Sequence, residues 1–196
     1  MKKIFLSLLF LLFAFDTNVV SDTSDSIQRI TEGNKNSKIT IITYESLTCS
    51  HCADFHKDIY PQLKKEFIDT GLVRIEFRHF PLDIASLNAS KISQCANDGN
   101  SKTLHFLFSN QENWVKGETI EDINKHLKKL LESQYTFLDF EKCINNKIVE
   151  DYILNDRIEG VQKFKVNATP TIIINNKKFD KSLNYKNLKK TLEKLI

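Results

Sequence analysis

The chain has 196 residues, of which 41% are hydrophobic and 27% are charged, as in an ordinary globular protein. This length suits one domain with a sizeable core and is too short for two comfortable domains. The formal net charge is only +3, and lysines are mixed with aspartates and glutamates throughout. The composition excludes an extended basic tract of the kind that binds nucleic acid, so we expect no nucleic-acid partner.

Residues 1–21 have the features of a secretory signal peptide. A positive start at Lys2 and Lys3 precedes an apolar run over residues 4–15, which is shorter than the roughly 20 apolar residues that span a bilayer. Small residues before position 22 predict cleavage after Ser21, and an uncleaved anchor is the alternative. We therefore expect an exported protein located in the periplasm.

The exported part should begin with a flexible lead-in over residues 22–36, which are rich in Asp, Ser, Thr and Asn. We expect one domain over residues 37–196. Its first strand is predicted by the β-branched run over residues 39–44. Apolar residues then recur at helical spacing from Cys52 to Phe67. Pro61 predicts a kink in this helix.

Gly71 should end the helix, and the alternation over residues 72–80 predicts a second strand. Residues 84–164 have helical patterns, and we place a helical insertion at about 84–150. The last predicted elements are a strand over 171–174, a turn, a short partner strand that starts at Lys178, and a closing helix from Tyr185. Without the insertion the order is βαβ followed by ββα, an α/β arrangement.

The stretch Cys49-Ser50-His51-Cys52 carries the most specific chemistry in the sequence. Haem attachment requires histidine directly after the second cysteine, and that residue is Ala53. A structural zinc site needs four ligands, and Cys95 and Cys143 lie in no second CxxC or CxxH pair, so we expect no metal. Thiol–disulfide exchange fits the strand-to-helix setting.

In that setting Cys49 lies at a helix N-terminus, where free N–H groups and the dipole favour a thiolate. Cys52 lies one turn further on the apolar face, so it should be buried and act as the resolving thiol of a Cys49–Cys52 redox disulfide. His51 can stabilise the neighbouring thiolate; otherwise it is a solvated loop residue. Thr169-Pro170 directly precedes a strand, where a cis bond beside Cys49 would let the Thr169 backbone pair with a substrate peptide.

From about Ile27 to its C-terminus the sequence resembles the DsbA family of disulfide oxidoreductases, above all its alphaproteobacterial branch. The resemblance rests on the CxHC stretch, on residues 77–83, on Cys95-Ala96 and on residues 166–171. It implies a thioredoxin fold with an inserted all-helical subdomain. It also implies an enzyme that donates its disulfide to newly exported, cysteine-containing proteins. No cofactor is implied, and a DsbB-like membrane oxidase would reoxidise the enzyme.

Two positions depart from the family pattern. The residue after the first cysteine is commonly proline in the family and is Ser50 here, which bears on the oxidising strength. An acid usually stands six residues before that cysteine, where this chain has Thr43. Glu45 shares a strand face with that position, so we hypothesise that it accepts the proton of Cys52. The alternative is an exposed glutamate at the strand end.

Cys95 and Cys143 lie in the helical block, outside the CxxC motif. In an exported protein an even number of cysteines favours disulfides, and similar extra pairs occur in relatives of this branch. We therefore expect a structural disulfide between them. Two buried free thiols or a second redox pair are the alternatives.

Two rival functions remain open from the sequence. The first is a periplasmic isomerase or reductase of the same fold. Isomerases usually add a dimerisation domain, for which the residues before Ile27 leave no room, so we expect a monomeric oxidase. The second rival is a metal- or peptide-binding module in which the CxxC motif is not catalytic.

Overall fold

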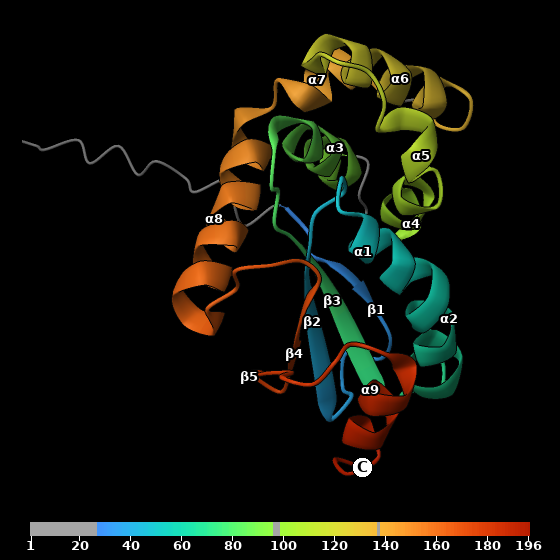
Figure 1. Cartoon of the computed structure of the whole chain (residues 1–196), viewed down its shortest axis with the longest axis vertical. Coiled ribbons are helices and arrows are strands. Elements are labelled where there is room, and N and C mark those ends of the chain that lie inside the picture. Colours follow the sequence, from blue (N-terminus) through green and yellow to red (C-terminus); the bar gives the residue numbers. More distant parts are fainter. Residues whose placement is uncertain (1–26, 96–98, 137) are drawn as a thin grey trace, which may run out of the picture.

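A computed structural model describes residues 27–95, 99–136 and 138–196, and the predicted signal peptide lies outside them. Within them, one sheet has the strand order β1-β3-β2-β4-β5 and is surrounded by helices (Figure 1). The strands are β1 (Ile30–Glu32), β2 (Ile39–Glu45), β3 (Val73–His79), β4 (Thr171–Ile174) and β5 (Lys177–Lys178). The central pair β2 and β3 is parallel, and the other pairs are antiparallel.

The strand β1 corrects one expectation from the sequence. Residues 30–32 belong to the predicted flexible lead-in, yet they pair with β3 from Ile30 opposite Phe77 to Glu32 opposite Ile75. Ile30 is almost fully buried. Three residues with a single buried apolar side chain give too weak a pattern to be read locally, and the pairing with β3 makes them a strand.

The helical stretch after β2 runs continuously from residue 50 to residue 68 and is called the CxxC helix below. It consists of α1 (Ser50–Asp54), a π-helical turn η2 (Phe55–Ile59), α2 (Tyr60–Leu63) and a second π-helical turn η3 (Lys64–Ile68). Pro61, where the sequence predicts a kink, lies in the first turn of α2. Because proline lacks an N–H group, the wider turn before it accommodates the missing backbone bond within a continuous helical path.

The two faces of the sheet pack against different helices. The face that carries Ile41 and Ile75 joins the main core with α1, α2 and the closing helix α9 (Tyr185–Leu192). The opposite face, with Ile42 and Tyr44, packs with Phe164 at the end of α8 (Lys147–Phe164), which lies along this side of the sheet (Figure 1). This alternation along β2 is expected for a strand buried on both faces.

Helix α8 also shows why Gly160 does not end a helix. A Cβ atom on Gly160 would lie 2.7 Å from Cε1 of Tyr44, so only glycine allows this close packing of α8 against β2. The expected end of the helical insertion, near residue 150, falls inside α8. A single helix therefore connects the helical subdomain to the sheet.

The rest of the subdomain consists of α3 (Ile84–Cys95), α4 (Lys102–Ser109), α5 (Gln111–Trp114), α6 (Ile120–Glu132) and α7 (Phe140–Ile144). Fully buried Leu104, Leu107 and Trp114 extend the main core into it. Thr119 caps α6 by accepting a hydrogen bond from the backbone N–H of Asp122 at 3.1 Å.

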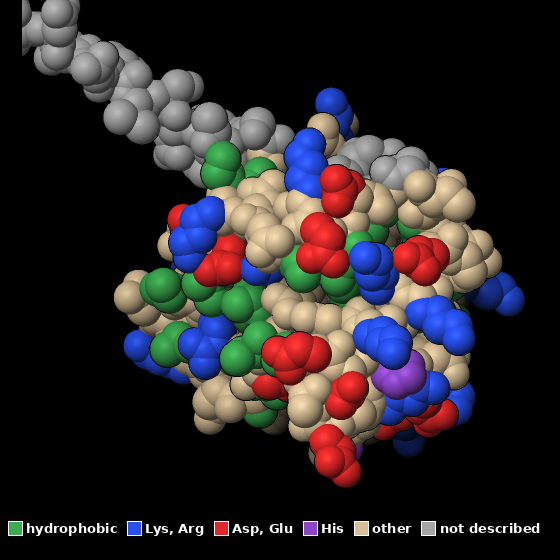
Figure 2. All heavy atoms as spheres, turned by 90° about the horizontal axis from the view of Figure 1, so that it is seen from above, with side chains coloured by type: hydrophobic (Ala, Val, Ile, Leu, Met, Phe, Trp, Pro, Cys, Tyr) green, Lys and Arg blue, Asp and Glu red, His purple; other side chains and the backbone are tan. Residues whose placement is uncertain are grey.

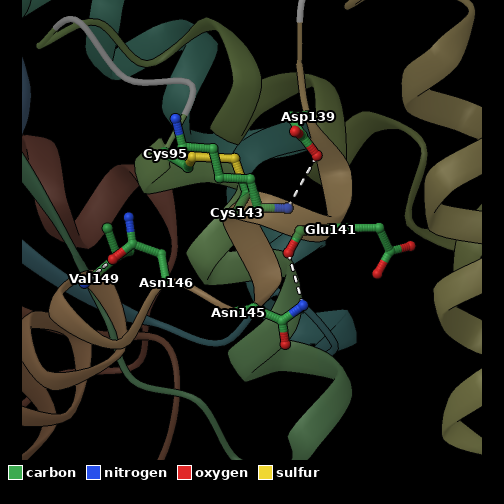
Figure 3. The surroundings of a disulfide bond; sticks show 8 residues. Cys95, Asp139, Glu141, Cys143, Asn145, Asn146 and Val149 are labelled. Carbon is green, nitrogen blue, oxygen red and sulfur yellow. Dashed lines mark hydrogen bonds between the residues drawn. A yellow bond between two sulfur atoms is a disulfide. The ribbon is translucent and has the colours of Figure 1, made fainter.

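Cys95 and Cys143 form a disulfide between the end of α3 and α7 (Figure 3). Short hydrogen-bonded turns surround it: the Cys143 N–H donates to the Asp139 carbonyl at 3.0 Å, and Asn146 Oδ1 accepts from the Val149 N–H at 3.1 Å. The disulfide closes a loop with a sequence separation of 48 and ties the two ends of the subdomain together.

Basic and acidic side chains alternate over the end of the molecule where the helical subdomain lies (Figure 2). That face carries no large patch of a single sign, in line with the small net charge of the chain. None of the helices formed by the described residues is both long and apolar enough to cross a bilayer.

Candidate redox site

The CxxC motif lies where β2 passes into α1, at the carboxyl end of the central strand. Cys49 is the N-cap of α1, and its carbonyl accepts hydrogen bonds from the N–H groups of Cys52 at 3.1 Å and Ala53 at 3.2 Å. The half-buried Cys49 side chain lies at the open end of the helix, and that of Cys52 is fully buried one turn further. Both cysteines are free thiols in this structure.

The loop before Cys49 is held from the helical subdomain. Ser86 Oγ accepts a hydrogen bond from the Leu47 N–H at 2.9 Å, and Thr48 Oγ1 donates to Asp83 Oδ2 at 2.6 Å. The side-chain amide of Gln111 donates to the carbonyls of Leu47 at 2.8 Å and Cys49 at 3.1 Å. These contacts fix the position of Cys49 from two helices that the chain reaches only much later.

The two thiols have opposite acidities. The pKa of Cys49 falls to about 5, mainly because its thiolate accepts hydrogen bonds from the Cys52 thiol and from the backbone N–H groups of Cys52 and His51. The pKa of Cys52 is raised far above its ordinary value by burial, by the hydrogen bond to Cys49 and by the negative charge of Glu45. At neutral pH the pair holds one exposed thiolate and one buried thiol.

The segment before β4 completes the site. The Thr169–Pro170 peptide bond, which the sequence predicts to be cis, is cis in the structure. The Cys49 thiol lies 3.3 Å from the Thr169 carbonyl oxygen, which can accept a hydrogen bond from it. Beside them a groove of about 620 Å³ is lined by residues from the CxxC helix, the proline segment and the start of α9, among them His51, Phe55, Ile59, Pro170 and Tyr185.

The side chain of His51 lies at the surface. It is 82% exposed, and its Nδ1 atom lies 3.7 Å from Asp54 Oδ2. The contribution of His51 to the low pKa of Cys49 comes from its backbone N–H. Such an exposed side chain at the rim of the groove is available to an incoming peptide.

Glu45 is buried, with a side chain only 3% exposed, so the exposed alternative considered for it is wrong. Its Oε2 atom lies 2.9 Å from Nε2 of His56, whose side chain is 4% exposed. Its Oε1 atom has no hydrogen-bond partner among the described residues. Thr43, two residues earlier, is also buried, and its hydroxyl likewise lacks a partner there.

Several residues of this site were not predicted from the sequence. His56 could have been found, because it stands four residues after Cys52 and therefore on the same side of a helix. His105 and Gln111 could not, because nothing local links α4 and α5 to the motif. Within the described ranges, no group of three or more His, Cys, Asp or Glu side chains is arranged to hold a metal ion.

The comparisons with known proteins agree with this geometry. The family model described as thioredoxin matches residues 25–194. The chain belongs to the thioredoxin family. It has the thioredoxin fold with an inserted helical subdomain, and within the family it is DsbA-like. The chain is similar to the crystal structure of alpha-DsbA1 from Wolbachia pipientis, with a TM-score of 0.77 and 27% sequence identity. The match covers 88% of this chain and 95% of alpha-DsbA1.

Curated relatives of this thioredoxin-family chain point the same way. A putative protein-disulfide oxidoreductase of Rickettsia bellii is 33% identical over 147 residues, which are 73% of this chain and 55% of the relative. Disulfide bond formation protein D of Bacillus subtilis is 27% identical over 172 residues, which are 83% of this chain and 74% of that protein. The chain spans about half the length of the Rickettsia relatives that it matches.

Proposed function

We propose that the protein is a thiol:disulfide oxidoreductase that donates a Cys49–Cys52 disulfide to cysteine-containing proteins. One observation carries the proposal: two cysteines separated by two residues hold a stabilised, accessible thiolate and a buried thiol that stays protonated. This asymmetry gives each sulfur atom a separate role in exchange. The similarity to proteins named for disulfide oxidation and formation supports the proposal.

In the oxidised enzyme a substrate thiolate attacks Cys49 Sγ, the sulfur that lies next to the Thr169 carbonyl. The Cys49–Cys52 bond breaks, its electron pair stays on Cys52, and Cys52 takes up a proton. A second substrate thiolate then attacks the substrate sulfur of the mixed disulfide, and Cys49 leaves as a thiolate. The substrate loses two electrons and gains a disulfide, and the enzyme gains the same two electrons.

The direction of net exchange follows from the low pKa of Cys49, which is the leaving group when the substrate disulfide forms. The interactions that lower the pKa of Cys49 act on the thiolate, so they stabilise the reduced enzyme. A stabilised reduced form makes the disulfide a stronger oxidant. The proposal is therefore net oxidation of substrates, with a DsbB-like membrane oxidase that removes the electrons and no bound cofactor.

Substrate binding is proposed for the groove beside Thr169 and Pro170. Because the Thr169 carbonyl lies next to Cys49, an extended peptide that pairs with this backbone would carry its cysteine to Cys49 Sγ. His51 at the rim would contact the same peptide, and Glu45 would exchange the proton of Cys52. These roles belong to a monomer exported to the periplasm by the predicted signal peptide.

The test is oxidation of a reduced two-cysteine peptide by the oxidised protein, beside insulin reduction as the reverse reaction. We expect fast peptide oxidation, slow insulin reduction and no peptide oxidation by Cys49→Ala. Equilibration with glutathione gives the reduction potential. A value near that of thioredoxin, about −270 mV, would favour the reductase alternative. Full activity of Cys49→Ala would instead leave the motif as part of a binding module.

A further inference from the structure

The proposed exchange cycle poses a problem at Cys52. Its thiol must gain a proton when the enzyme disulfide opens and lose one when the disulfide reforms, yet the side chain is fully buried. We propose that His56 and His105, anchored by the anion of Glu32, form a proton relay that connects the buried side chain of Glu45 with the solvent. This inference rests on the proposed function and adds residues that lie outside the CxxC motif.

The relay is a continuous line of hydrogen bonds across four elements. Glu45 Oε2 on β2 lies 2.9 Å from His56 Nε2 on the CxxC helix. His56 Nδ1 lies 2.9 Å from His105 Nδ1 on α4. His105 Nε2 lies 2.8 Å from Glu32 Oε1 on β1. The line joins residues that are up to 73 positions apart in the sequence.

The hydrogen bonds determine how many protons the line holds. Each of its three bonds needs one hydrogen between its two atoms. With both carboxylates ionised, the two imidazole rings must share three N–H protons, which means that one ring is an imidazolium. A shift along the bonds moves the extra charge between the rings or places the proton on Glu45. The line thus holds one proton that can move without any side-chain rotation.

The rings are held in the orientation that this transfer needs. His56 stacks on Phe108 with ring centroids 4.1 Å apart, and His105 stacks on Tyr60 at 4.4 Å. Both rings also contact Phe77. Aromatic neighbours on several sides keep water and competing donors away from the bonds between Glu45 and His105.

The two ends of the line differ in exposure. The inner side chains of Glu45 and His56 are 3% and 4% exposed, whereas those of His105 and Glu32 are 24% and 14% exposed. The outer end is therefore the part of the line that is more accessible to water. The inner end acts on Cys52 through its charge, which raises the pKa of that thiol, and Glu45 Oε1 is buried with no hydrogen-bond partner among the described residues.

The outer end is built to remain an anion. Glu32 accepts hydrogen bonds from Tyr60 at 2.5 Å and from Ser101, and Lys64 lies 3.2 Å away. The pKa of Glu32 is well below its usual range, because His105, Ser101 and Tyr60 hydrogen-bond its ionised form against the cost of burial. The other charged or titratable groups around the line are Cys49, Cys52, Tyr60 and Lys64, with Asp54 and Lys57 at the opening beside His56.

The test isolates the step in which Cys52 loses its proton. Reduced protein is mixed with oxidised glutathione, and the glutathione mixed disulfide at Cys49 is trapped by acid at successive times and measured by mass. Its decay follows attack by the Cys52 thiolate, which forms the Cys49–Cys52 disulfide and releases glutathione. The decay rate is measured over a range of pH for the wild type, for His105→Gln and for a control, His126→Gln, in the helical subdomain.

We expect His105→Gln to slow the decay by about tenfold and to change its pH profile, since a glutamine can hydrogen-bond but cannot relay a proton. His126→Gln should match the wild type, and the titration of the Cys49 thiolate, read from its ultraviolet absorbance, should be the same in all three proteins. Free imidazole should accelerate His105→Ala, in which the partly exposed ring is missing. A structural role alone could slow the decay, but it would give neither the changed pH profile nor the acceleration by free imidazole.

An unchanged pH profile in a folded His105→Gln protein would overturn the relay. If that variant does not fold, Glu32→Gln interrupts the same line at its outer end and must show the same slower, altered decay. If the wild type itself forms no mixed disulfide with glutathione, the proposed function fails first. That result is distinct from normal exchange with unaltered variants.

Discussion

The two cysteine pairs of this molecule could both form a disulfide, yet one pair is free and the other is bonded. Cys49 and Cys52 are two residues apart, lie at a strand-to-helix junction and are free thiols with opposed acidities. Cys95 and Cys143 are joined across two helices of the subdomain with a sequence separation of 48. The environment, rather than the sulfur atom, distinguishes the pair that we propose to cycle from the pair that is bonded.

Replacing Cys49 should have the largest effect on the rate of peptide oxidation. Cys49→Ala removes the atom that forms the mixed disulfide, so peptide oxidation should fall to the rate without enzyme. The double variant Cys95→Ala/Cys143→Ala is the control, because it removes two sulfur atoms that lie outside the CxxC motif. It should retain most of the exchange rate. Similar losses in both variants would contradict the division of roles.

The same double variant should show its effect in stability. Without the disulfide the unfolded chain regains the entropy of a long loop, which corresponds to at most about 4 kcal/mol in the free energy of unfolding. Urea unfolding of the oxidised forms measures it. An equally stable double variant would show that the subdomain holds its ends together without the bond.

Glu45→Gln tests the environment of the buried thiol and leaves both cysteine pairs intact. The amide cannot take the proton of Cys52, so decay of the glutathione mixed disulfide should slow by about tenfold, with a changed pH profile. The exposed Glu141→Gln in the subdomain is the control. A profile identical to that of the wild type would remove Glu45 from the mechanism.

The smallest expected effect is a pH-dependent difference in stability between the reduced and oxidised forms. Only the reduced protein has the Cys49 thiolate, whose pKa falls from about 9 to about 5 on folding. A lowered pKa stabilises the folded state above the unfolded value, and this contribution disappears as the pH falls through the folded value.

The gap between the unfolding free energies of the two forms should therefore move in favour of the oxidised protein as the pH falls from about 9 to about 5. Carboxylates titrate in both forms, so the gap isolates the thiol. A constant gap over this range would show that Cys49 has an ordinary pKa.

The central strands, the CxxC helix and the closing βα segment could be predicted because their residues carry the pattern locally. Residues 39–44 are β-branched and apolar, and the helix after Cys49 repeats at helical spacing. The edge strand β1 and the π-helical turns could not be predicted. Each depends on pairing or packing that short, weakly patterned sequences do not specify.

The pair Cys49 and Cys52 and their order on the helix follow from local sequence, because a spacing of two residues and a strand-to-helix junction are local properties. The surroundings of the two cysteines depend on tertiary packing. Gln111 reaches the loop from α5, Glu45 becomes a buried acid, and His105 meets His56 across the subdomain boundary. These contacts lie between segments far apart in the chain, where no local pattern records a neighbour and only the packed core brings the groups within hydrogen-bond distance.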